Sequence, residues 1–188
     1  EVLELIETHL AAAPDRQFKL IANLPYNVAT PIISNLLMLD VPPKSMTVTI
    51  QKEVGDRIVA RPGTKDYGAL SIWVQSQCRV EIVRVMPPSV FWPRPKVDSA
   101  IVQIELDAER RGQVADRAYF HQFVRSMFFH RRKFLRSVLV SAVKDQLGKT
   151  EVDAILERLS LRPDSRAEEL DVPTMLTLCE AVRTATGS

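Results

Sequence analysis

The chain has 188 residues, with 25 Lys and Arg, 23 Asp and Glu, and 46% hydrophobic residues. This length allows one large domain or two small ones, and the composition is that of a globular protein with an ordinary core. No run of about 18 apolar residues occurs, so the sequence predicts no membrane span. No secretory signal pattern occurs either, so we expect a cytoplasmic or similarly reducing location.

The cysteines and histidines indicate no metal site. Cys78 and Cys179 lie far apart, each in an apolar helical pattern. They are compatible with one disulfide or with two buried thiols, and the expected location favours thiols. No paired Cys or His spacing of the kind that binds zinc is present, so we expect no metal.

Positive charge is concentrated in one segment. Residues 119–149 carry seven basic side chains against Asp145 alone, a local charge of +6, whereas residues 1–118 are balanced and residues 150–188 are acidic. Such a block indicates a polyanionic partner, although a solvated basic helix face would have the same composition.

The first part of the chain alternates predicted helices and strands. We expect an N-terminal helix over 1–13, a short strand over 18–21, and a helix from Thr30, the expected N-cap, to about 39. A strand over 46–51 and helices over 52–60 and 69–78 follow. This alternation predicts a parallel α/β sheet.

Two further strands are predicted over 79–85 and 99–106. Between them, residues 86–97 contain four prolines and are expected to be irregular. A crossover helix does not fit such a connection, so the two strands are expected to form an antiparallel pair at a sheet edge.

Only helices are predicted after the last strand. A charged linker over 107–117 precedes helices over about 116–129, 131–147, 151–160 and 173–185. The third is expected to be capped by Thr150 with Asp153, and the fourth near Asp171. The predicted domains are therefore an α/β part, 1–108, and an α-helical part, 112–188.

The most informative motif is Asn23-Leu24-Pro25-Tyr26, directly after the first predicted strand. Ligands bind at the carboxyl ends of strands in open α/β sheets. A tetrapeptide is weak evidence alone, and a simple turn with a packed tyrosine remains an alternative.

With three further stretches, the motif resembles the ribosomal RNA adenine dimethyltransferases. The stretches are Gln51-Lys52-Glu53-Val54 leading to Tyr67-Gly68, Pro87-Pro88-Ser89-Val90-Phe91 leading to Pro93-Arg94-Pro95-Lys96-Val97-Asp98-Ser99-Ala100, and Arg131-Arg132-Lys133 followed by Arg166-Ala167-Glu168-Glu169-Leu170. Together they cover nearly the whole chain. The resemblance implies the C-terminal part of a Rossmann-like methyltransferase sheet, followed by a small all-α domain.

The resemblance also implies roles for the motif. Asn23 and the Leu24 carbonyl would accept the two N–H groups of an adenine amine, Pro25 would fix the turn, and Tyr26 would stack on the base. Phe91 would form the second wall of the base pocket, the alternative being a core position between prolines. Asn23 is also the only expected contact to S-adenosylmethionine.

The remaining assignments concern the loop and the basic segment. Trp92 stands where the family does not require an aromatic residue, and we expect it to be structural or to lie at the rim of the base pocket. Lys96 is expected to form an ion pair with Asp98. Phosphate contacts to RNA are assigned to Arg125, Arg131, Arg132, Lys133 and Arg136. Core positions are assigned to Phe120, Phe123, Phe128 and Phe134, and surface or half-buried helix positions to His121 and His130.

The implied activity is that of a longer protein. The Gly-rich turn and the ribose-binding acid of the family do not occur in these residues, and the chain starts without Met inside an amphipathic pattern. We therefore expect a fragment that is inactive alone. Its parent would be a monomer that dimethylates two adjacent adenines near the 3′ end of small-subunit ribosomal RNA. The alternatives are a resistance-type large-subunit methyltransferase and a non-enzymatic ribosome-assembly or mitochondrial transcription factor.

Overall fold

The computed structural model describes residues 8–9 and 16–187. Apart from residues 8 and 9, the helix predicted over 1–13 lies outside these residues. The chain forms two compact units, one from residues up to 59 together with 77–112, and one from 60–76 together with 113–188.

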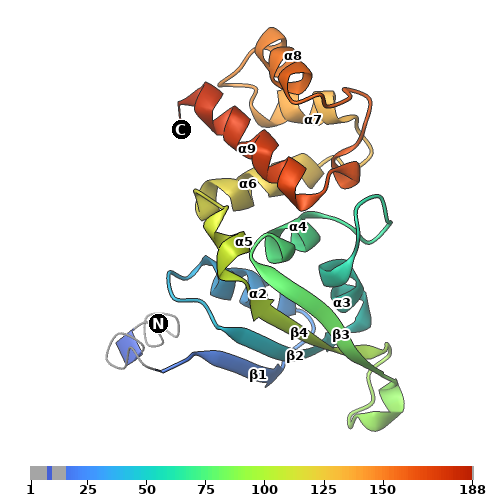
Figure 1. The fold of residues 1–188 in the computed structure, drawn as a ribbon. Coiled ribbons are helices and arrows are strands. Elements are labelled where there is room, and N and C mark those ends of the chain that lie inside the picture. The colour runs from blue at the N-terminus through green and yellow to red at the C-terminus, as the bar shows by residue number, and fades with distance from the viewer. Residues whose placement is uncertain (1–7, 10–15, 188) are drawn as a thin grey trace. The chain divides into compact units, whose positions relative to one another are not determined.

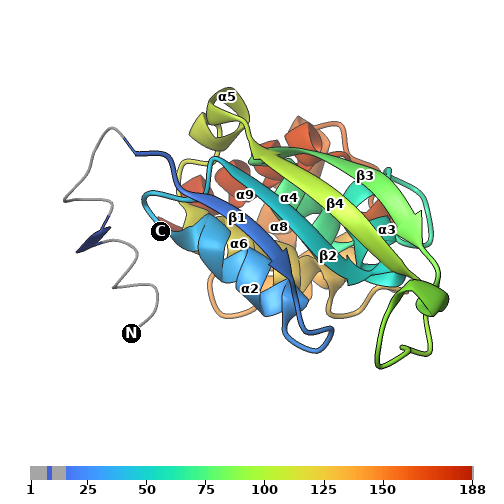
Figure 2. The same ribbon diagram turned by 90° about the horizontal axis from the view of Figure 1, so that it is seen from below.

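The first unit contains a four-stranded sheet (Figures 1 and 2). Its strands are β1 (Lys19–Asn23), β2 (Ser45–Gln51), β3 (Cys78–Met86) and β4 (Ser99–Leu106). The strands lie in the order β1-β2-β4-β3, with β1 parallel to β2 and β4 antiparallel to both of its neighbours. The predicted antiparallel pair at the edge of the sheet is confirmed.

One face of the sheet is buried, as the alternation of the sequence predicts. Val48 of β2 lies opposite Val102 of β4, and both are fully buried. The neighbouring pairs on the same face are Met46 with Ile104 and Ile50 with Ala100. A Cβ added to Gly55 would lie 3.1 Å from Val102 and 3.3 Å from Ala100, so the helix that carries Gly55 packs closely on β4.

The first unit contains α2 (Ala29–Met38), α3 (Lys52–Val59), which includes Gly55, the 3-10 helix η1 (Pro88–Val90) and α5 (Ala108–Gly112). Thr30 does not cap α2, because the helix already begins at Ala29 and its N-cap Val28 makes no side-chain hydrogen bond. The segment 107–117, predicted as a linker, contains α5. The Asp107 carboxylate accepts hydrogen bonds from the amides of Glu109 and Arg110 and so starts this short helix.

Arg111 of α5 holds the end of α2. Its guanidinium donates to the carbonyls of Leu37 at 2.8 Å and Leu39 at 2.6 Å, and also to the Gln77 side chain. The last carbonyls of a helix have no partner within the helix, so Arg111 satisfies two groups that would otherwise need water. This contact fixes α5 to the helix that follows the Asn23 turn.

The second unit is helical. It contains α4 (Ala69–Gln75), α6 (Arg117–Phe128), α7 (Leu135–Ala142), α8 (Lys149–Arg158) and α9 (Val172–Thr186), with short 3-10 turn η2 (Ala167–Glu169). The sequence placed α4 in the α/β part, but residues 60–76 pack with the C-terminal helices. Trp73 of α4 is 2% exposed, with its ring 6.4 Å from Phe120 of α6. Tyr67 donates to the Leu170 carbonyl at 3.0 Å.

Two helix starts differ from the sequence prediction. Helix α7 begins at Leu135 rather than at 131. Residues 130–133 form a turn instead, which the hydrogen bond from the Lys133 amide to the His130 carbonyl closes. The Leu135 amide donates to the Ser165 carbonyl, outside the helix. Helix α8 is capped at Gly148, whose amide donates to Glu151, so Thr150 and Asp153 form no capping box. The predicted cap at Asp171 is confirmed by its bond to the Thr174 amide.

Cys78 and Cys179 are both buried and form no disulfide, which agrees with the prediction of two buried thiols. Burial raises the pKa of the Cys78 thiol and that of the Cys179 thiol to about 12. Among the described helices, none is both long and apolar enough to cross a membrane.

His121 is expected to make the second unit less stable in acid. It is half-buried on α6, with its ring 4.6 Å from Trp73, and burial, followed by the nearby Arg125, lowers its pKa below 6.5. The unfolded chain therefore takes up the proton first, and stability that is complete above about pH 6.5 is lost as the pH falls toward the lowered folded pKa. Melting temperatures between pH 7.5 and 5.5 should fall less for His121→Gln than for the unmodified protein. The exposed His130→Gln serves as control, and equal falls in all three proteins would contradict this expectation.

Candidate functional site

The Asn23 turn leaves the sheet at the carboxyl end of β1. Asn23 is the last residue of the strand and is exposed. The next residue is anchored, because the Leu24 amide donates to the Thr49 carbonyl at 3.0 Å and the Leu24 side chain is buried. The Pro25 carbonyl accepts from the Val28 amide at 3.1 Å, which closes the turn before α2.

Two acceptors of this turn remain available. Within the described part of the chain, neither the Asn23 side-chain oxygen nor the Leu24 carbonyl accepts a hydrogen bond. The Pro25 carbonyl, by contrast, is used inside the turn. Asn23 and Leu24 thus retain the two acceptor oxygens that a primary amine with two N–H groups requires.

Tyr26 is held by a residue that sequence reasoning did not single out. Its hydroxyl is hydrogen-bonded to the Ser99 hydroxyl at 2.7 Å. Ser99 is fully buried at the start of β4, so a rigid strand fixes the tyrosine ring. The two residues are 73 positions apart. The alternation of β4 does not mark Ser99, because Ser99 shares the strand face of Ile101 and Gln103 and not that of the buried Ala100, Val102 and Ile104.

Phe91 and the Asn23 turn line one cavity of about 380 Å³. This volume lies within the range of about 300–1,000 Å³ that is common for ligand clefts. The cavity is lined by Asn23, Leu24, Pro25, Tyr26, Phe91, Trp92, Pro93 and Pro95. Every residue of the predicted catalytic set therefore lies around the same space, although α2, β2, α3, α4 and β3 separate Tyr26 from Phe91 in the chain.

The loop between β3 and β4 carries Phe91 and Trp92, and it lacks the ion pair that was predicted for it. Phe91 is half-buried and Trp92 is 95% exposed, so Trp92 belongs to the rim and has no structural role in the core. Lys96 and Asp98 form no ion pair within the described residues. The Asp98 backbone instead anchors the loop, since its carbonyl accepts from the Lys52 amide at 2.9 Å.

The methyl transfer that the resemblance implies for the full-length protein is expected to be moderately slower in each of the variants Ser99→Ala and Tyr26→Phe. A neutral hydrogen bond contributes about 0.5–1.5 kcal/mol, which corresponds to a loss of about 2- to 12-fold if the whole effect falls on the rate. Because both changes break the same bond, the double variant should lose no more than either single variant. Losses that multiply in a kinetic double-mutant cycle would show that Ser99 does not act through Tyr26.

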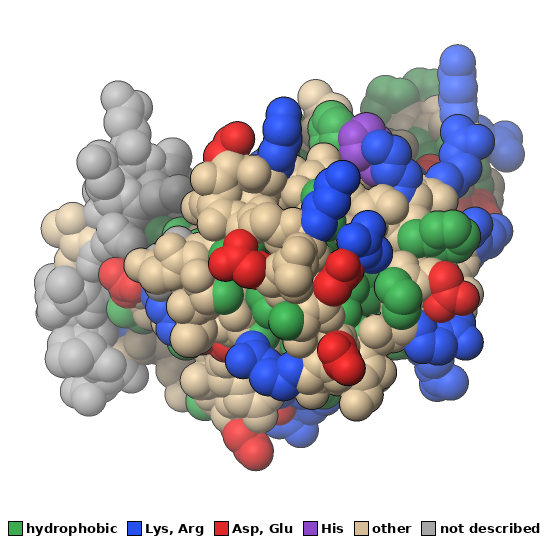
Figure 3. Space-filling view, turned by 90° about the horizontal axis from the view of Figure 1, so that it is seen from above, with side chains coloured by type: hydrophobic (Ala, Val, Ile, Leu, Met, Phe, Trp, Pro, Cys, Tyr) green, Lys and Arg blue, Asp and Glu red, His purple; other side chains and the backbone are tan. Residues whose placement is uncertain are grey.

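The structure divides the predicted RNA-contacting residues into two groups. Arg131 donates to the carboxylate of Glu168 and to the Thr64 carbonyl, and Arg136 forms a two-point contact with Asp153 that lowers the pKa of that carboxyl. Arg125, Arg132 and Lys133 are exposed, and the described residues offer them no ion pair. On the face drawn in Figure 3, basic side chains lie among acidic ones rather than in one continuous patch.

The turn between α6 and α7 also exposes two aromatic rings. Phe134, predicted as a core residue, is 53% exposed, and Phe129 is 81% exposed. Phe134 is the N-cap residue of α7 and not part of the helix. Its side chain therefore does not lie on the buried helix face that carries Leu135 and Leu139. The core assignments of Phe120 and Phe123 are confirmed, and Phe128 is half-buried.

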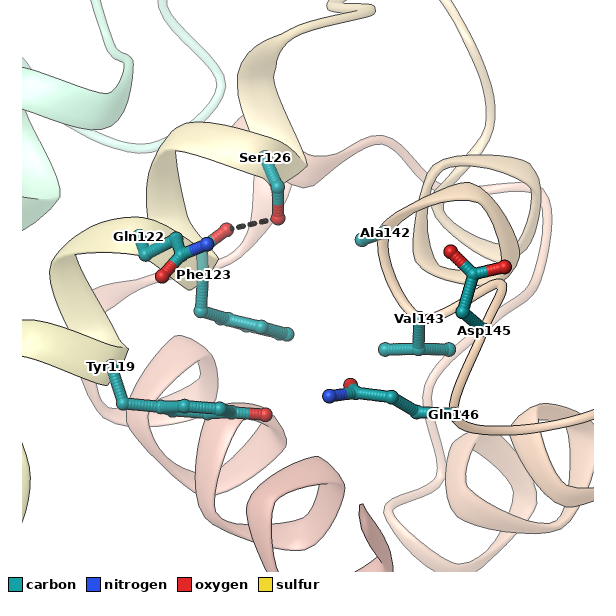
Figure 4. A pocket seen from close by; sticks show the side chains of 8 residues that line it. All are labelled: Tyr119, Gln122, Phe123, Ser126, Ala142, Val143, Asp145 and Gln146. Atoms are coloured by element: carbon teal, nitrogen blue, oxygen red, sulfur yellow. Dashed lines mark hydrogen bonds between the residues drawn. The ribbon is translucent and has the colours of Figure 1, made fainter. Parts of the chain in front are cut away.

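A second cavity of about 400 Å³ lies inside the helical unit (Figure 4). Tyr119 and Phe123 of α6 face Val143 and Gln146 across it. Burial raises the pKa of the Tyr119 hydroxyl. No residue of the predicted motifs lines this space, and we assign it no ligand.

The carboxyl ends of the strands are where ligands bind in open α/β sheets, and the cavity with its free acceptors lies at that place in an α/β domain. Comparison with known proteins identifies the particular family. The family model described as "Ribosomal RNA adenine dimethylase" matches residues 2–183, and the chain belongs to this family.

Several relatives are named "Ribosomal RNA small subunit methyltransferase A". The protein of that name from Clostridium acetobutylicum is 44% identical over 84% of this chain and 56% of its own length. The one from Lactiplantibacillus plantarum is 41% identical over 98% of this chain and 62% of its own length. The chain thus spans about three fifths of the length of these relatives.

Solved structures show the same fold. A dimethyladenosine transferase from Plasmodium falciparum matches with a TM-score of 0.80 and 24% identity, over 90% of this chain and 68% of that one. The 23S rRNA methyltransferase ErmE matches with a TM-score of 0.61 and 19% identity, over 96% and 77%. These likenesses confirm the expected fold class, part of a methyltransferase α/β sheet followed by helices.

Proposed function

We propose that the full-length protein dimethylates the amino nitrogens of two adjacent adenines near the 3′ end of small-subunit ribosomal RNA. S-adenosylmethionine would be the methyl donor, and the reaction would take place in the cytoplasm during maturation of the subunit. The observation that carries this proposal is the pair of free acceptors, Asn23 and the Leu24 carbonyl, beside Tyr26 and Phe91 in one cavity.

The two acceptors address the chemical difficulty of the reaction. The amino nitrogen of adenine is a poor nucleophile because its lone pair is delocalised into the ring. Hydrogen bonds from its two N–H groups to Asn23 and to the Leu24 carbonyl favour a pyramidal nitrogen, with the lone pair directed away from the acceptors. The anchored Leu24 amide and the closed turn keep this geometry in place before the base arrives.

The aromatic residues hold the base outside its stack. Tyr26, fixed by Ser99, would contact one face of adenine, and Phe91 the other. An enzyme that modifies a base must first remove it from neighbouring bases, and stacking on protein rings offsets part of that cost. The half-buried Phe91 and Tyr26 are compatible with such a sandwich.

The chain offers one residue for the cofactor. When bound, S-adenosylmethionine would supply an electrophilic methyl group. Asn23 is at the end of β1, lines the cavity and has no side-chain hydrogen bond to a described residue, so its amide is available to both cofactor and base. The methylated amine is acidic enough to release its proton to water, so the mechanism needs neither a carboxylate base nor a metal ion, and we expect a monomer to suffice.

RNA contact is proposed for the exposed cations of the helical unit. Arg125, Arg132 and Lys133 are available for phosphates, whereas Arg131 and Arg136 already pair with carboxylates. The relatives with 41–44% identity carry the name of small-subunit enzymes, which favours that substrate over the large-subunit RNA named for ErmE.

A substrate comparison tests this proposal. The full-length protein should incorporate labelled methyl groups into immature small subunits and far less into large subunits or their RNA. Preferential labelling of large-subunit RNA would favour a resistance-type enzyme. Tight binding to small subunits without any incorporation would favour a non-enzymatic assembly factor, and either result would overturn the proposal.

A further inference from the structure

Trp92 is exposed to an unusual degree. Its side chain is 95% accessible, more than that of any other exposed large hydrophobic residue in the described chain. Tryptophan is enriched at interfaces, because its ring offers a large apolar surface and its N–H a polar contact.

The loop that carries Trp92 is held in a defined shape. Prolines lie on both sides of it, at positions 87, 88, 93 and 95. The Phe91 amide donates to the Pro88 carbonyl at 3.2 Å, which forms a 3-10 turn just before Trp92. The far end of the loop is anchored by the bond between the Lys52 amide and the Asp98 carbonyl. The backbone around Trp92 therefore loses little conformational entropy when the ring makes a contact.

The position of Trp92 relates it to the base site. It lines the same cavity as Tyr26 and Phe91, but Phe91 is half-buried whereas Trp92 is almost fully exposed. Trp92 therefore stands at the exposed edge of a space that the half-buried rings of Tyr26 and Phe91 also line. Arg94 and Lys96 follow on the same loop, both exposed and without an ion pair to any described residue.

An exposed aromatic ring with cations close by in the chain is the combination that binds single-stranded nucleic acid. The ring stacks on a base and the cations attract the phosphates on either side. We propose that Trp92 stacks on the unpaired base next to the adenine that occupies the cavity. This inference rests on the proposed function, and in a substrate with two adjacent adenines that neighbour is the other adenine.

Kinetics on immature small subunits test the inference in the full-length protein. Trp92→Ala should raise KM by about 5- to 150-fold, the loss expected for one base–aromatic stack, with a much smaller change in kcat. Trp92→Phe should restore most of the affinity because it retains a ring. Val90→Ala is the matched control, since Val90 is 61% exposed on the same loop and does not line the cavity.

A fluorescence titration examines the stack without any methyl transfer. Binding of a single-stranded RNA oligonucleotide with two adjacent adenines should quench tryptophan emission in the unmodified protein, and Trp92→Phe should lose that quenching. A KM for Trp92→Ala equal to that of Val90→Ala, or equal quenching in Trp92→Phe, would overturn the inference while leaving the proposed function intact. Absence of methyl transfer by the unmodified protein would instead overturn the proposed function, and the titration would still decide the role of Trp92.

Discussion

Asn23→Ala in the full-length protein is expected to lower methyl transfer by more than about 100-fold while leaving affinity for the small subunit within about twofold. A loss of this size corresponds to about 2.7 kcal/mol, which is typical for one positioned polar group at a reacting centre. Asn23 is exposed at the end of β1 and has no side-chain partner in the described residues, so its removal leaves no buried group unsatisfied.

Two further variants make the Asn23 result specific. Asn23→Asp keeps an acceptor oxygen at the same position and should retain more activity than Asn23→Ala. Asn27→Ala removes the same side chain from an exposed position four residues later, outside the cavity lining, and should leave the rate nearly unchanged. Melting temperatures should be equal in all variants. Methyl transfer by Asn23→Ala within about twofold of the unmodified protein would refute the catalytic assignment.

Replacing Arg132 and Lys133 together by alanine is expected to weaken binding to the small subunit and to reduce its dependence on salt. Each phosphate contact contributes about 0.7–0.9 to the slope of log affinity against log salt concentration. Loss of two contacts should therefore reduce the magnitude of the slope by about 1.4–1.8. The fold should be unaffected, because both side chains are exposed on the turn before α7.

The structure determines which residues belong in this test. Arg131 is left intact because it joins Glu168 to the Thr64 carbonyl, and its removal would mix a structural effect with loss of charge. The matched control is Lys144→Ala with Lys149→Ala, which removes two exposed positive charges from the same basic segment outside the turn. If both double variants reduce the slope equally, the contribution is one of general charge, and the turn has no specific contact with RNA.

The sequence predicted local structure well, but not which elements pack together. The strands follow from a short apolar run, a Val-rich run and two alternating runs, and the antiparallel β3–β4 pair follows from a proline-rich connection that cannot form a helix. Helix α4 also has a clear apolar pattern, but such a pattern gives the buried face and not its partner. The partner turned out to be α6, through Trp73 and Phe120, rather than the sheet.

The candidate site was predictable to the extent that it is local. Asn23 to Tyr26 form one continuous turn, and the resemblance indicated Phe91 as their partner. The Ser99 contact with Tyr26 is 73 residues distant in sequence and depends on strand pairing, which no local pattern specifies. The exposure of Phe134 was missed because it depends on where α7 begins, and helix ends are the least certain part of a periodic pattern.

We propose that this chain positions adenine amino groups for methylation. Nucleoside analysis by mass spectrometry, after incubation of full-length protein, S-adenosylmethionine and immature small subunits, tests it most directly. We expect N6,N6-dimethyladenosine at two adjacent positions near the 3′ end of the small-subunit RNA, and its loss in the Asn23→Ala variant. Methylation at another atom or another base, or dimethyladenosine formed equally well by Asn23→Ala, would contradict it.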